Sequence, residues 1–468
     1  MRGASLCIAL LLAVVVTLCA GCGGGVQQAQ PRRSVPSITG GYGYGMEAAD
    51  IRPADQVQVF EADFYGHRAL KMTNGIVALV AVPEFGGRIM EYKIGSKPLL
   101  WVNLDEVQAT GPATSAEGAG ALSATKRIWR NWGGYKVWPA PQTRWQGPPD
   151  PAGSQLDGGQ WVGRIVRPRG KVGEIELTSP ADKTVTGLQI TRRVTMETGT
   201  TRVRVQETFK NVSSKTIEWS IWDVTQVPGS LAPDEVASED ARVYFPVNSK
   251  SRFEGGYKLL IDKPSSQWRV LEGGLVEVSY KGELGKIGAD STAGWIAYVD
   301  DRHDWAYVKR FDFQEGATYP DGGCNVEVYT SDKESYMEVE VLSTLRKIEP
   351  GAEMSFSEDW YAARVSAPLR QVVEMAAIAV PPALEQKEGK MRVVGTLGVF
   401  APGKLQLMVL DKHDKPLGKP TELSVGPAEQ VALAQNIALL PGATAVKIKL
   451  VTGANESQIA RLALGNGK

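Results

Sequence analysis

Cysteine and histidine are both scarce in this chain, which has four cysteines and three histidines among 468 residues. Cys7, Cys19 and Cys22 fall near the N-terminus, so Cys324 stands alone in the rest of the chain. One thiol cannot build a disulfide framework or a cysteine-based zinc site. We expect Cys324 to be a small buried hydrophobic residue.

Net charge is lacking as well, because 52 Lys and Arg residues balance 52 Asp and Glu residues. No overall field therefore steers the chain toward nucleic acid, and we predict no nucleic-acid partner. Beyond the first 21 residues, no apolar run approaches the roughly 20 residues that a membrane span needs. The sequence has no P-loop, no dinucleotide-binding glycine pattern and no Gly-x-Ser-x-Gly motif. We expect no cofactor.

Two Asp-Gly-Gly stretches are the nearest approach to a metal-binding loop. They read "LDGG" at 156–159 and "PDGG" at 320–323. Neither has the Asp-x-Asp-x-Asp-Gly spacing of a calcium loop. We expect ordinary turns at both places and no metal site.

The N-terminus has the layout of a bacterial secretion signal over residues 1–21, with Arg2 followed by the apolar run "LCIALLLAVVVTLCAG". The run ends in "LCAGC", which resembles a lipobox and would make Cys22 the acylated residue. Cys19 occupies a place where a lipobox usually has an aliphatic residue. We predict export to the bacterial cell envelope, with a lipid anchor as the membrane contact; soluble export to the periplasm is the alternative. Residues 22–50 have the Gly-, Gln- and Ser-rich composition of a flexible linker.

Alternating apolar and polar residues dominate the chain from about residue 57. Examples are "VQVFEADF", "LQITRRVTME", "CNVEVYT" and "YMEVEVLSTLRKI". This pattern, separated by Gly, Pro, Asn and Asp, is typical of β-strands. It predicts an all-β fold in which residues 51–366 form a large antiparallel sandwich of two curved sheets.

The C-terminal part of the chain differs in composition. Only "PLRQVVEMAAIA", residues 368–379, has helical spacing, so we expect a connecting helix and linker over 367–390. Residues 391–468 contain no Trp and no Tyr. They predict a small accessory β-sandwich of about seven strands with a structural role.

Two segments resemble galactose-mutarotase-like proteins. The first is "NGIVALVAVPEFGGRIMEYKIGSKPLLWVN", which is similar to their opening strands, and the second is "YMEVEVLSTLRKIEPGAEMSFSEDWYAARV", which is similar to their closing strands. Between them, "NWGGYKVWPAPQTRW" and the "DGG" at 157–159 resemble the bacterial family called domain of unknown function 4380. The resemblance covers roughly residues 57–363. It implies a mutarotase-like supersandwich with a sugar site on its concave sheet face.

Tryptophan is concentrated in one part of the chain, because six of the twelve tryptophans fall between residues 101 and 161: Trp101, Trp129, Trp132, Trp138, Trp145 and Trp161. Rigid rings can stack on sugars while neighbouring polar groups bond the hydroxyls, and Pro and Gly reduce the ordering that binding requires. The predicted mono- or oligosaccharide contacts are Trp132, Lys136, Trp138, Gln142, Arg144, Trp145, Asp157 and Asp223. Lys136 and Arg144 could anchor an acidic sugar. The alternative is a hydrophobic lid over the sandwich.

Glutamates on alternating strands are the main catalytic candidates. Alternation places Glu338 and Glu340 on one face of a strand, and valines flank Glu327 in the same way. Two close glutamates would raise one pKa and permit acid–base chemistry. The resemblance implies that Glu340 is nearest the family's base. The alternative is a solvated sheet face paired with Arg or Lys.

Histidine gives a weaker candidate. Mutarotases use histidines in motifs such as Asn-His-x-Tyr-Phe, and no such motif occurs here. His303, in the turn "VDDRHDW", is a candidate acid, whereas His67 and His413 are not. Three functions remain open: a sugar-binding protein without turnover, which we favour; an epimerase or glycan-cleaving enzyme with a glutamate base; and a structural envelope protein. The sequence identifies no protein partner.

Overall fold

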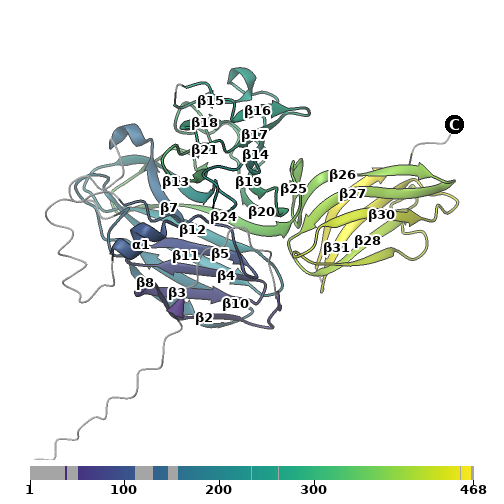
Figure 1. Cartoon of the computed structure of the whole chain (residues 1–468), viewed down its shortest axis with the longest axis horizontal. Helices are drawn as coiled ribbons and strands as arrows, with labels where there is room; N and C mark the ends of the chain where they lie inside the picture. The colour runs from purple at the N-terminus through teal and green to yellow at the C-terminus, as the bar shows by residue number, and fades with distance from the viewer. Residues whose placement is uncertain are drawn as a thin grey trace, which may run out of the picture. The chain divides into compact units, whose positions relative to one another are not determined.

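The computed structural model describes residues 51–110, 130–145, 156–232, 234–261, 263–453 and 455–464, together with the backbone of 37–38 (Figure 1). The predicted signal at 1–21, the acylation site Cys22 and Trp129 lie outside these residues. So does most of the predicted linker, although Ser37–Ile38 forms a short strand, β1, parallel to β2. Within the described part, no helix is long and apolar enough to cross a membrane.

A fourteen-stranded sheet makes one layer of the large sandwich. Its described strand pairs are antiparallel except for β1 with β2. The strand path is β1 (Ser37–Ile38), β2 (Val57–Phe64), β3 (His67–Thr73), β4 (Val77–Val82), β5 (Arg88–Ile94), β7 (Tyr135–Ala140), β13 (Ile217–Pro228), β22 (Tyr336–Leu342), β21 (Val326–Thr330), β18 (Gly285–Ala289) and β15 (Lys258–Leu259). Off this path lie β6 (Lys97–Pro98), β9 (Arg169–Gly170) and β23 (Arg346–Ile348).

A ten-stranded antiparallel sheet makes the second layer. Its order is β16 (Trp268–Leu271), β17 (Leu275–Ser279), β14 (Ala241–Pro246), β19 (Trp295–Asp300), β20 (Trp305–Phe311), β24 (Glu353–Arg364), β12 (Val203–Asn211), β11 (Leu188–Glu197), β10 (Val172–Thr178) and β8 (Val162–Arg167). The described helices are short: α1 (Leu104–Thr110) and the 3₁₀ turns Gln142–Arg144 and Glu254–Gly256. The all-β prediction is confirmed.

The core lies where the two sheets face each other. Tyr135 of β7, in the first sheet, packs edge-on against Trp360 of β24, in the second, with 5.0 Å between ring centroids. Tyr92 and Tyr307 lie 5.8 and 5.5 Å from the same indole. All four side chains are fully buried. Rings of this size bury much apolar area and hold the sheets together.

The predicted helix over 368–379 is wrong. The chain there forms β25 (Gln371–Val373) and the start of β26 (Ala376–Lys387). Residues 376–379 are all buried, so the apolar run fills the inside of a sheet rather than one face of a helix. Pro381 and Pro382 follow within β26 and would interrupt a helix, whereas the strand accommodates them with register shifts.

The accessory sandwich therefore begins before residue 391 and has eight strands rather than about seven. One four-stranded sheet has the order β25, β26, β27 (Lys390–Val399) and β30 (Val431–Ile437). The other has the order β29 (Thr421–Val425), β28 (Gly403–Leu410), β31 (Ala445–Thr452) and β32 (Asn455–Ala463). Apolar residues such as Leu397, Leu405 and Ile448 fill the space between them.

Two smaller predictions are also confirmed. Cys324 is buried and unpaired. The Asp-Gly-Gly stretches at 156–159 and 320–323 are turns.

Candidate functional site

Five neighbouring strands of the large sheet, β7, β13, β22, β21 and β18, share a face rich in charged and aromatic residues. On β22, Val339 and Val341 point into the core, so alternation turns Glu338 and Glu340 to the opposite side. We call this surface the polar face and define it by Lys136, Trp138, Trp222, Gln226, Lys286, Glu327, Glu338 and Glu340.

Register brings these side chains together from distant parts of the sequence. Glu327 of β21 is directly opposite Glu340 of β22. In the same way, Gln226 of β13 is opposite Glu338. Trp138 of β7 is opposite Trp222 of β13. Cross-strand partners have Cβ atoms about 5 Å apart, which is close enough for direct contact.

A single lysine holds the two facing glutamates. The Nζ atom of Lys286 lies 2.8 Å from Oε2 of Glu327 and 2.9 Å from Oε2 of Glu340. The two carboxylates are 1% and 0% exposed, and the lysine side chain is 14% exposed. Facing glutamates would repel each other, and the shared ammonium offsets that repulsion.

Burial and charge set the protonation of this triad. Burial raises the pKa of Glu327 and of Glu340, and a neighbouring carboxylate raises each further, while Lys286 opposes the rise. Burial opposes ionisation of Lys286, but the two carboxylates outweigh it and raise the pKa of the lysine. One ammonium facing two buried carboxyl groups favours a pair that shares one proton.

A second lysine lies beside the triad. Lys136 is 3.3 Å from Oε1 of Glu338, and burial lowers the pKa of this lysine. Gln226 donates to the same glutamate oxygen at 2.9 Å. The Lys136 ammonium lies 4.4 Å from the ring centroid of Trp138, within the range of a cation–π contact.

Indole rings form one side of the polar face. Trp138 makes edge contacts with Trp145 at 5.5 Å and Trp222 at 5.4 Å. Trp222 donates from Nε1 to Oε2 of Glu340 at 2.6 Å, and Lys286 lies 4.4 Å from its ring centroid. Trp138 donates to Asp157 at 2.8 Å. Trp222 and Trp138 therefore pack against neighbouring rings and also position the carboxylates of Glu340 and Asp157 through their N–H groups.

Several predicted residues meet here. Lys136, Trp138, Glu327 and Glu340 belong to the polar face, and Trp145 and Asp157 contact it through Trp138. Asp157 is also held by Arg88 at 2.9 Å.

Trp132, by contrast, belongs to a separate apolar cluster. Its ring stacks on Phe85 at 4.9 Å, and its Nε1 donates to Thr110 at 2.8 Å. The side chain is 5% exposed, comparable to the 7% of Trp138 and the 3% of Trp222, so its contacts rather than its burial distinguish it from the polar face. The surroundings of Trp132 therefore fit the alternative prediction, in which the tryptophans form a hydrophobic lid over the sandwich.

Arg144 and Gln142 also lie apart from the carboxylates. Arg144 bonds the main-chain oxygen of Glu218 and lies 2.8 Å from its carboxylate. Gln142 is exposed in the adjoining 3₁₀ turn. Neither has a described contact with the triad.

Asp223 points to the wrong side for a ligand contact. It lies between the two sheets, bonded to Lys309 of β20 and to the Val341 amide. Burial and the neighbouring Glu358 raise its pKa well above the ordinary value, against the attraction of Lys309. Every position from Trp219 to Pro228 of β13 is buried, so a polar residue there could face either the core or the polar face. The prediction of Asp223 as a binding residue is corrected.

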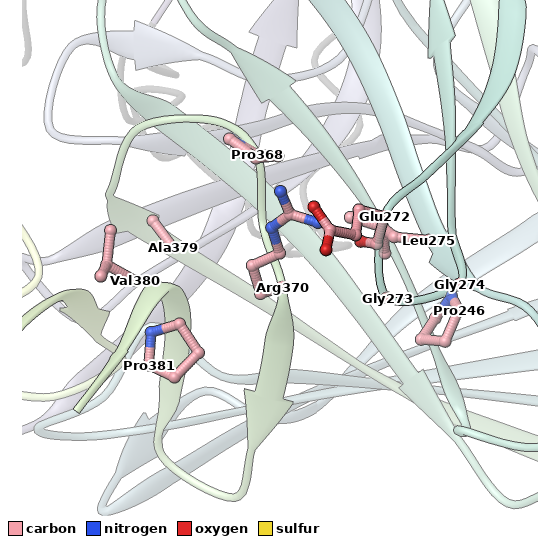
Figure 2. Close-up of a pocket in the computed structure, with 10 residues that line it drawn as sticks. All are labelled: Pro246, Glu272, Gly273, Gly274, Leu275, Pro368, Arg370, Ala379, Val380 and Pro381. Atoms are coloured by element: carbon pink, nitrogen blue, oxygen red, sulfur yellow. The ribbon is translucent and has the colours of Figure 1, made fainter. Parts of the chain in front are cut away.

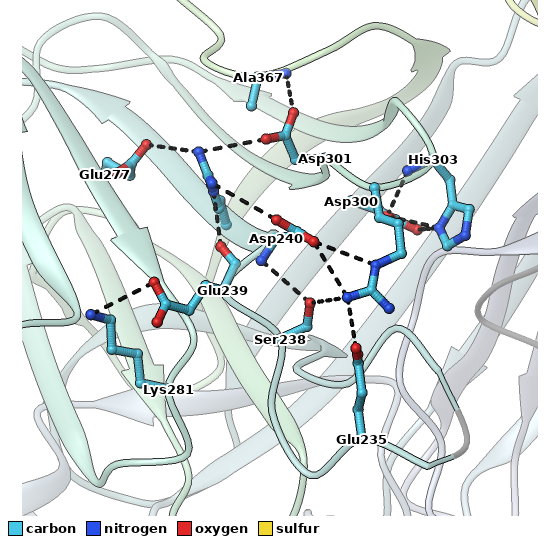
Figure 3. Close-up of polar contacts among 12 residues, drawn as sticks. Glu235, Ser238, Glu239, Asp240, Glu277, Lys281, Asp300, Asp301, His303 and Ala367 are labelled. Atoms are coloured by element: carbon cyan, nitrogen blue, oxygen red, sulfur yellow. Dashed lines mark hydrogen bonds and ion pairs between the residues drawn. The ribbon is translucent and has the colours of Figure 1, made fainter.

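His303 lies in the turn between β19 and β20, on the second sheet. Its Nδ1 is 2.9 Å from Oδ2 of Asp300 (Figure 3). The same carboxylate oxygen also binds Lys97 at 2.5 Å. Among the described contacts, none joins His303 to Glu327 or Glu340. The structure does not bring the predicted acid and the predicted bases together.

Lys286 and Trp222 were missed from the sequence, and Gln226 was noted beside Asp223 as a polar residue in an apolar strand without being predicted as a ligand contact. Lys286 occupies a polar position in "GKIGA", but its partners are on β21 and β22, and only the strand order reveals that pairing. Trp222 and Gln226 were available as further members of the strand "IWDVTQVP".

Other features offer less chemistry. A cavity of about 520 Å³ is lined largely by backbone, proline and aliphatic groups, with Arg370 donating to the Glu272 carbonyl at 2.7 Å (Figure 2). In the described ranges, no group of three or more His, Cys, Asp or Glu residues is arranged to hold a metal ion.

Comparison with known proteins gives a family and a set of similar folds. A family model described as "Domain of unknown function (DUF4380)" matches residues 68–363. No curated protein matches the sequence. A solved TPR-domain containing protein from Parabacteroides distasonis is 12% identical with a TM-score of 0.42; the match covers 66% of this chain and 49%, about half, of that one.

Two further solved structures are galactose mutarotase-like proteins. The one from Clostridium acetobutylicum is 11% identical with a TM-score of 0.41, and the match covers 66% of this chain and 99% of that chain. The one from Lactobacillus casei is 12% identical with a TM-score of 0.41, covering 63% and 99%. At such identities the likeness concerns the fold alone.

Proposed function

We propose that this chain, which belongs to the DUF4380 family as its sequence predicted, binds a mono- or oligosaccharide on the polar face. Binding without turnover is the function that the geometry supports best. The ligand contacts Trp138 and Trp222 with its ring and the glutamates with its hydroxyl groups.

The observation that carries this proposal is a set of unused acceptors. Oε1 of Glu327, Oε1 of Glu340 and Oε1 of Gln226 are buried, and no donor of the described residues bonds them, although the Asp321 carboxyl lies within hydrogen-bonding contact of Glu327. Buried polar atoms are nearly always bonded, and an unpaired one costs about 1–3 kcal/mol. Sugar hydroxyls would satisfy such acceptors, while the adjacent indoles would cover the apolar face of a sugar ring.

A second candidate is a sugar-active enzyme. The observation that favours it is the facing pair Glu327 and Glu340, in which burial raises both pKa values. A pair that holds one proton can supply both an acid and a base near neutral pH. In this alternative Glu340 is the base, and Glu327, rather than His303, returns the proton.

The place of action is a further part of the proposal. The protein is exported and held at the cell envelope by a lipid on Cys22, with soluble export to the periplasm as the alternative. Only the signal-like sequence of residues 1–22 supports this assignment.

Tryptophan fluorescence and melting temperature, followed against neutral sugars, uronic acids, amino sugars and oligosaccharides, test the binding proposal. A saturable spectral change together with a raised melting temperature supports it, because a ligand of the native state stabilises that state. Glu340→Gln should keep at least part of the affinity if the protein only binds. If the protein is an enzyme, the same change removes turnover of the bound sugar and leaves binding largely intact.

A further inference from the structure

On the polar face, the main hydrogen-bond donors are bonded to protein groups, whereas several acceptor atoms are not. The Lys286 ammonium is engaged by two carboxylates and by the Trp222 ring. Trp222 donates to Glu340, and Gln226 donates to Glu338. Among the described residues, no donor bonds Oε1 of Glu327, Glu340 or Gln226, although the Asp321 carboxyl lies beside Glu327.

The two glutamates of the triad are unpaired at corresponding atoms. Lys286 contacts Oε2 of Glu327 and Oε2 of Glu340, whereas Oε1 of each is buried and accepts no hydrogen bond from a donor in the part of the chain that the structure describes. The triad on its own holds one shared proton, and a second ammonium at the Oε1 atoms would take the place of that proton and give two positive charges for two carboxylates. Buried charges are stable only when they are paired and hydrogen-bonded, so this arrangement favours a cationic ligand over a neutral one.

The charge count of the polar face leads in the same direction. Its three carboxyl groups, Glu327, Glu338 and Glu340, face two lysines, Lys136 and Lys286. When all five groups are ionised, one negative charge is in excess; in the absence of a ligand the proton that Glu327 and Glu340 share cancels it, and the Asp321 carboxyl beside Glu327 is a further acidic group. An anionic ligand would add to that excess, and a cationic ligand would cancel it.

The sequence left open an acidic sugar as the ligand, but both basic residues expected to bind it already form ion pairs within the protein. Lys136 is bound to Glu338, and Arg144 is bound to Glu218. A ligand carboxylate would have to displace a protein carboxylate at either place and would then lie near further glutamates. Like charges brought together in a buried site are unfavourable.

We propose that the polar face selects a saccharide that carries a free, protonated amine, whose ammonium donates to Oε1 of Glu327 and Oε1 of Glu340 beside the Trp222 ring. This inference rests on the proposed carbohydrate site and names its ligand class. Lys286 keeps its own contacts with the Oε2 atoms. An N-acetylated or uncharged sugar lacks the second positive charge and leaves the triad as it is.

Fluorescence titration at one pH and one ionic strength tests this selection. The probes are D-glucosamine, N-acetyl-D-glucosamine, D-glucose and D-glucuronate, with tetrasaccharides of glucosamine and of N-acetylglucosamine for a site that needs a longer ligand. The free amine should bind about tenfold more tightly than its N-acetylated counterpart, because hydrogen bonds to charged groups are about twice as strong as neutral ones.

Isosteric variants assign the effect to the triad. Glu327→Gln and Glu340→Gln should each bring the affinities for amine and N-acetyl forms to within about twofold, and retain the neutral sugar. Glu277→Gln is the matched control, since Glu277 is also buried and bound to Arg269 but lies on β17 of the second sheet. It should keep the preference. Melting curves of all three show whether each variant is folded.

The outcomes separate the two proposals. Equal binding of amine, N-acetyl and neutral forms would overturn the amine selection and leave carbohydrate binding standing. Tighter binding of glucuronate would overturn it as well, with the lysines as anchors instead. If both folded Gln variants still prefer the amine over the N-acetyl form, the amine selection by the triad would also be overturned. No binding of any probe by folded protein would remove the carbohydrate site and this inference together.

Discussion

Replacing Lys286 by methionine tests the charge balance of the triad. The methionine keeps a long apolar stem next to Trp222 and removes the ammonium that both carboxylates share. The carboxylate that was ionised then has no counter-charge in a buried position. It must take up a proton for the protein to stay folded.

The magnitude follows from the protonation step. An unfolded glutamate has a pKa near 4.3, so holding one carboxyl protonated at pH 7 costs about 1.36 kcal/mol for each of about 2.7 pH units, or about 3.7 kcal/mol. This agrees with the roughly 3–5 kcal/mol measured when a buried ion pair loses one partner. Lys286→Met should therefore lower the free energy of unfolding by about 4 kcal/mol at pH 7.

The sign of the pH dependence is determined by a raised carboxyl pKa. Such a group favours the folded state below its unfolded pKa and loses that contribution as pH rises toward its folded pKa. The difference between Lys286→Met and the parent should be small near pH 4.5 and grow by about 1.4 kcal/mol per pH unit up to pH 7.

Urea unfolding from pH 4.5 to 8 measures this difference. Lys281→Met is the control, since Lys281 is a more exposed lysine 3.8 Å from Glu239, and its loss should change stability by less than about 1 kcal/mol. Adding Glu340→Gln to Lys286→Met should recover part of the loss. A deficit of Lys286→Met that is equally large at pH 4.5 and pH 7 would show lost packing and refute the charge argument.

Three further changes separate core, site and export. Lys309→Met should destabilise the fold by about 3–5 kcal/mol in urea, because it leaves Asp223 charged or protonated between the sheets; an unchanged midpoint would contradict the buried pair. Trp132→Ala should cost about 3–5 kcal/mol yet leave saccharide affinity in the folded fraction unchanged, whereas Trp222→Phe should weaken saccharide binding with a smaller change in melting temperature. Cys22→Ala should move the protein from the membrane fraction to the soluble periplasmic fraction, and an unchanged distribution would argue against acylation.

The sequence predicted the strands and the direction of the glutamates because both depend on local alternation. Glu338 and Glu340 follow the period of two that valines establish on β22. Alternation could not settle Asp223, because the surrounding strand is buried on both faces. It also failed at 368–379, where a short apolar run fits a helix and a buried strand equally.

The side-chain contacts within the site could not be predicted from the sequence, for a different reason. Lys286 meets Glu327 and Glu340 only because β18, β21 and β22 are neighbours, and strand order is a long-range property of the fold. The structural alternative for the glutamates was half right, because they pair with a lysine across strands as it expected but are buried rather than solvated. Their catalytic role stays a prediction.

Binding of a saccharide at the polar face is the central claim, and one titration addresses it most directly. Tryptophan fluorescence of the parent protein and of Glu340→Gln would be followed against the saccharide panel, with melting curves of both to show that they are folded. We predict saturable binding by the parent, with a raised melting temperature, and a weaker or altered response by the variant. A flat response of folded parent protein to every saccharide would contradict the claim and leave the tryptophans and the triad as structural elements of the sandwich.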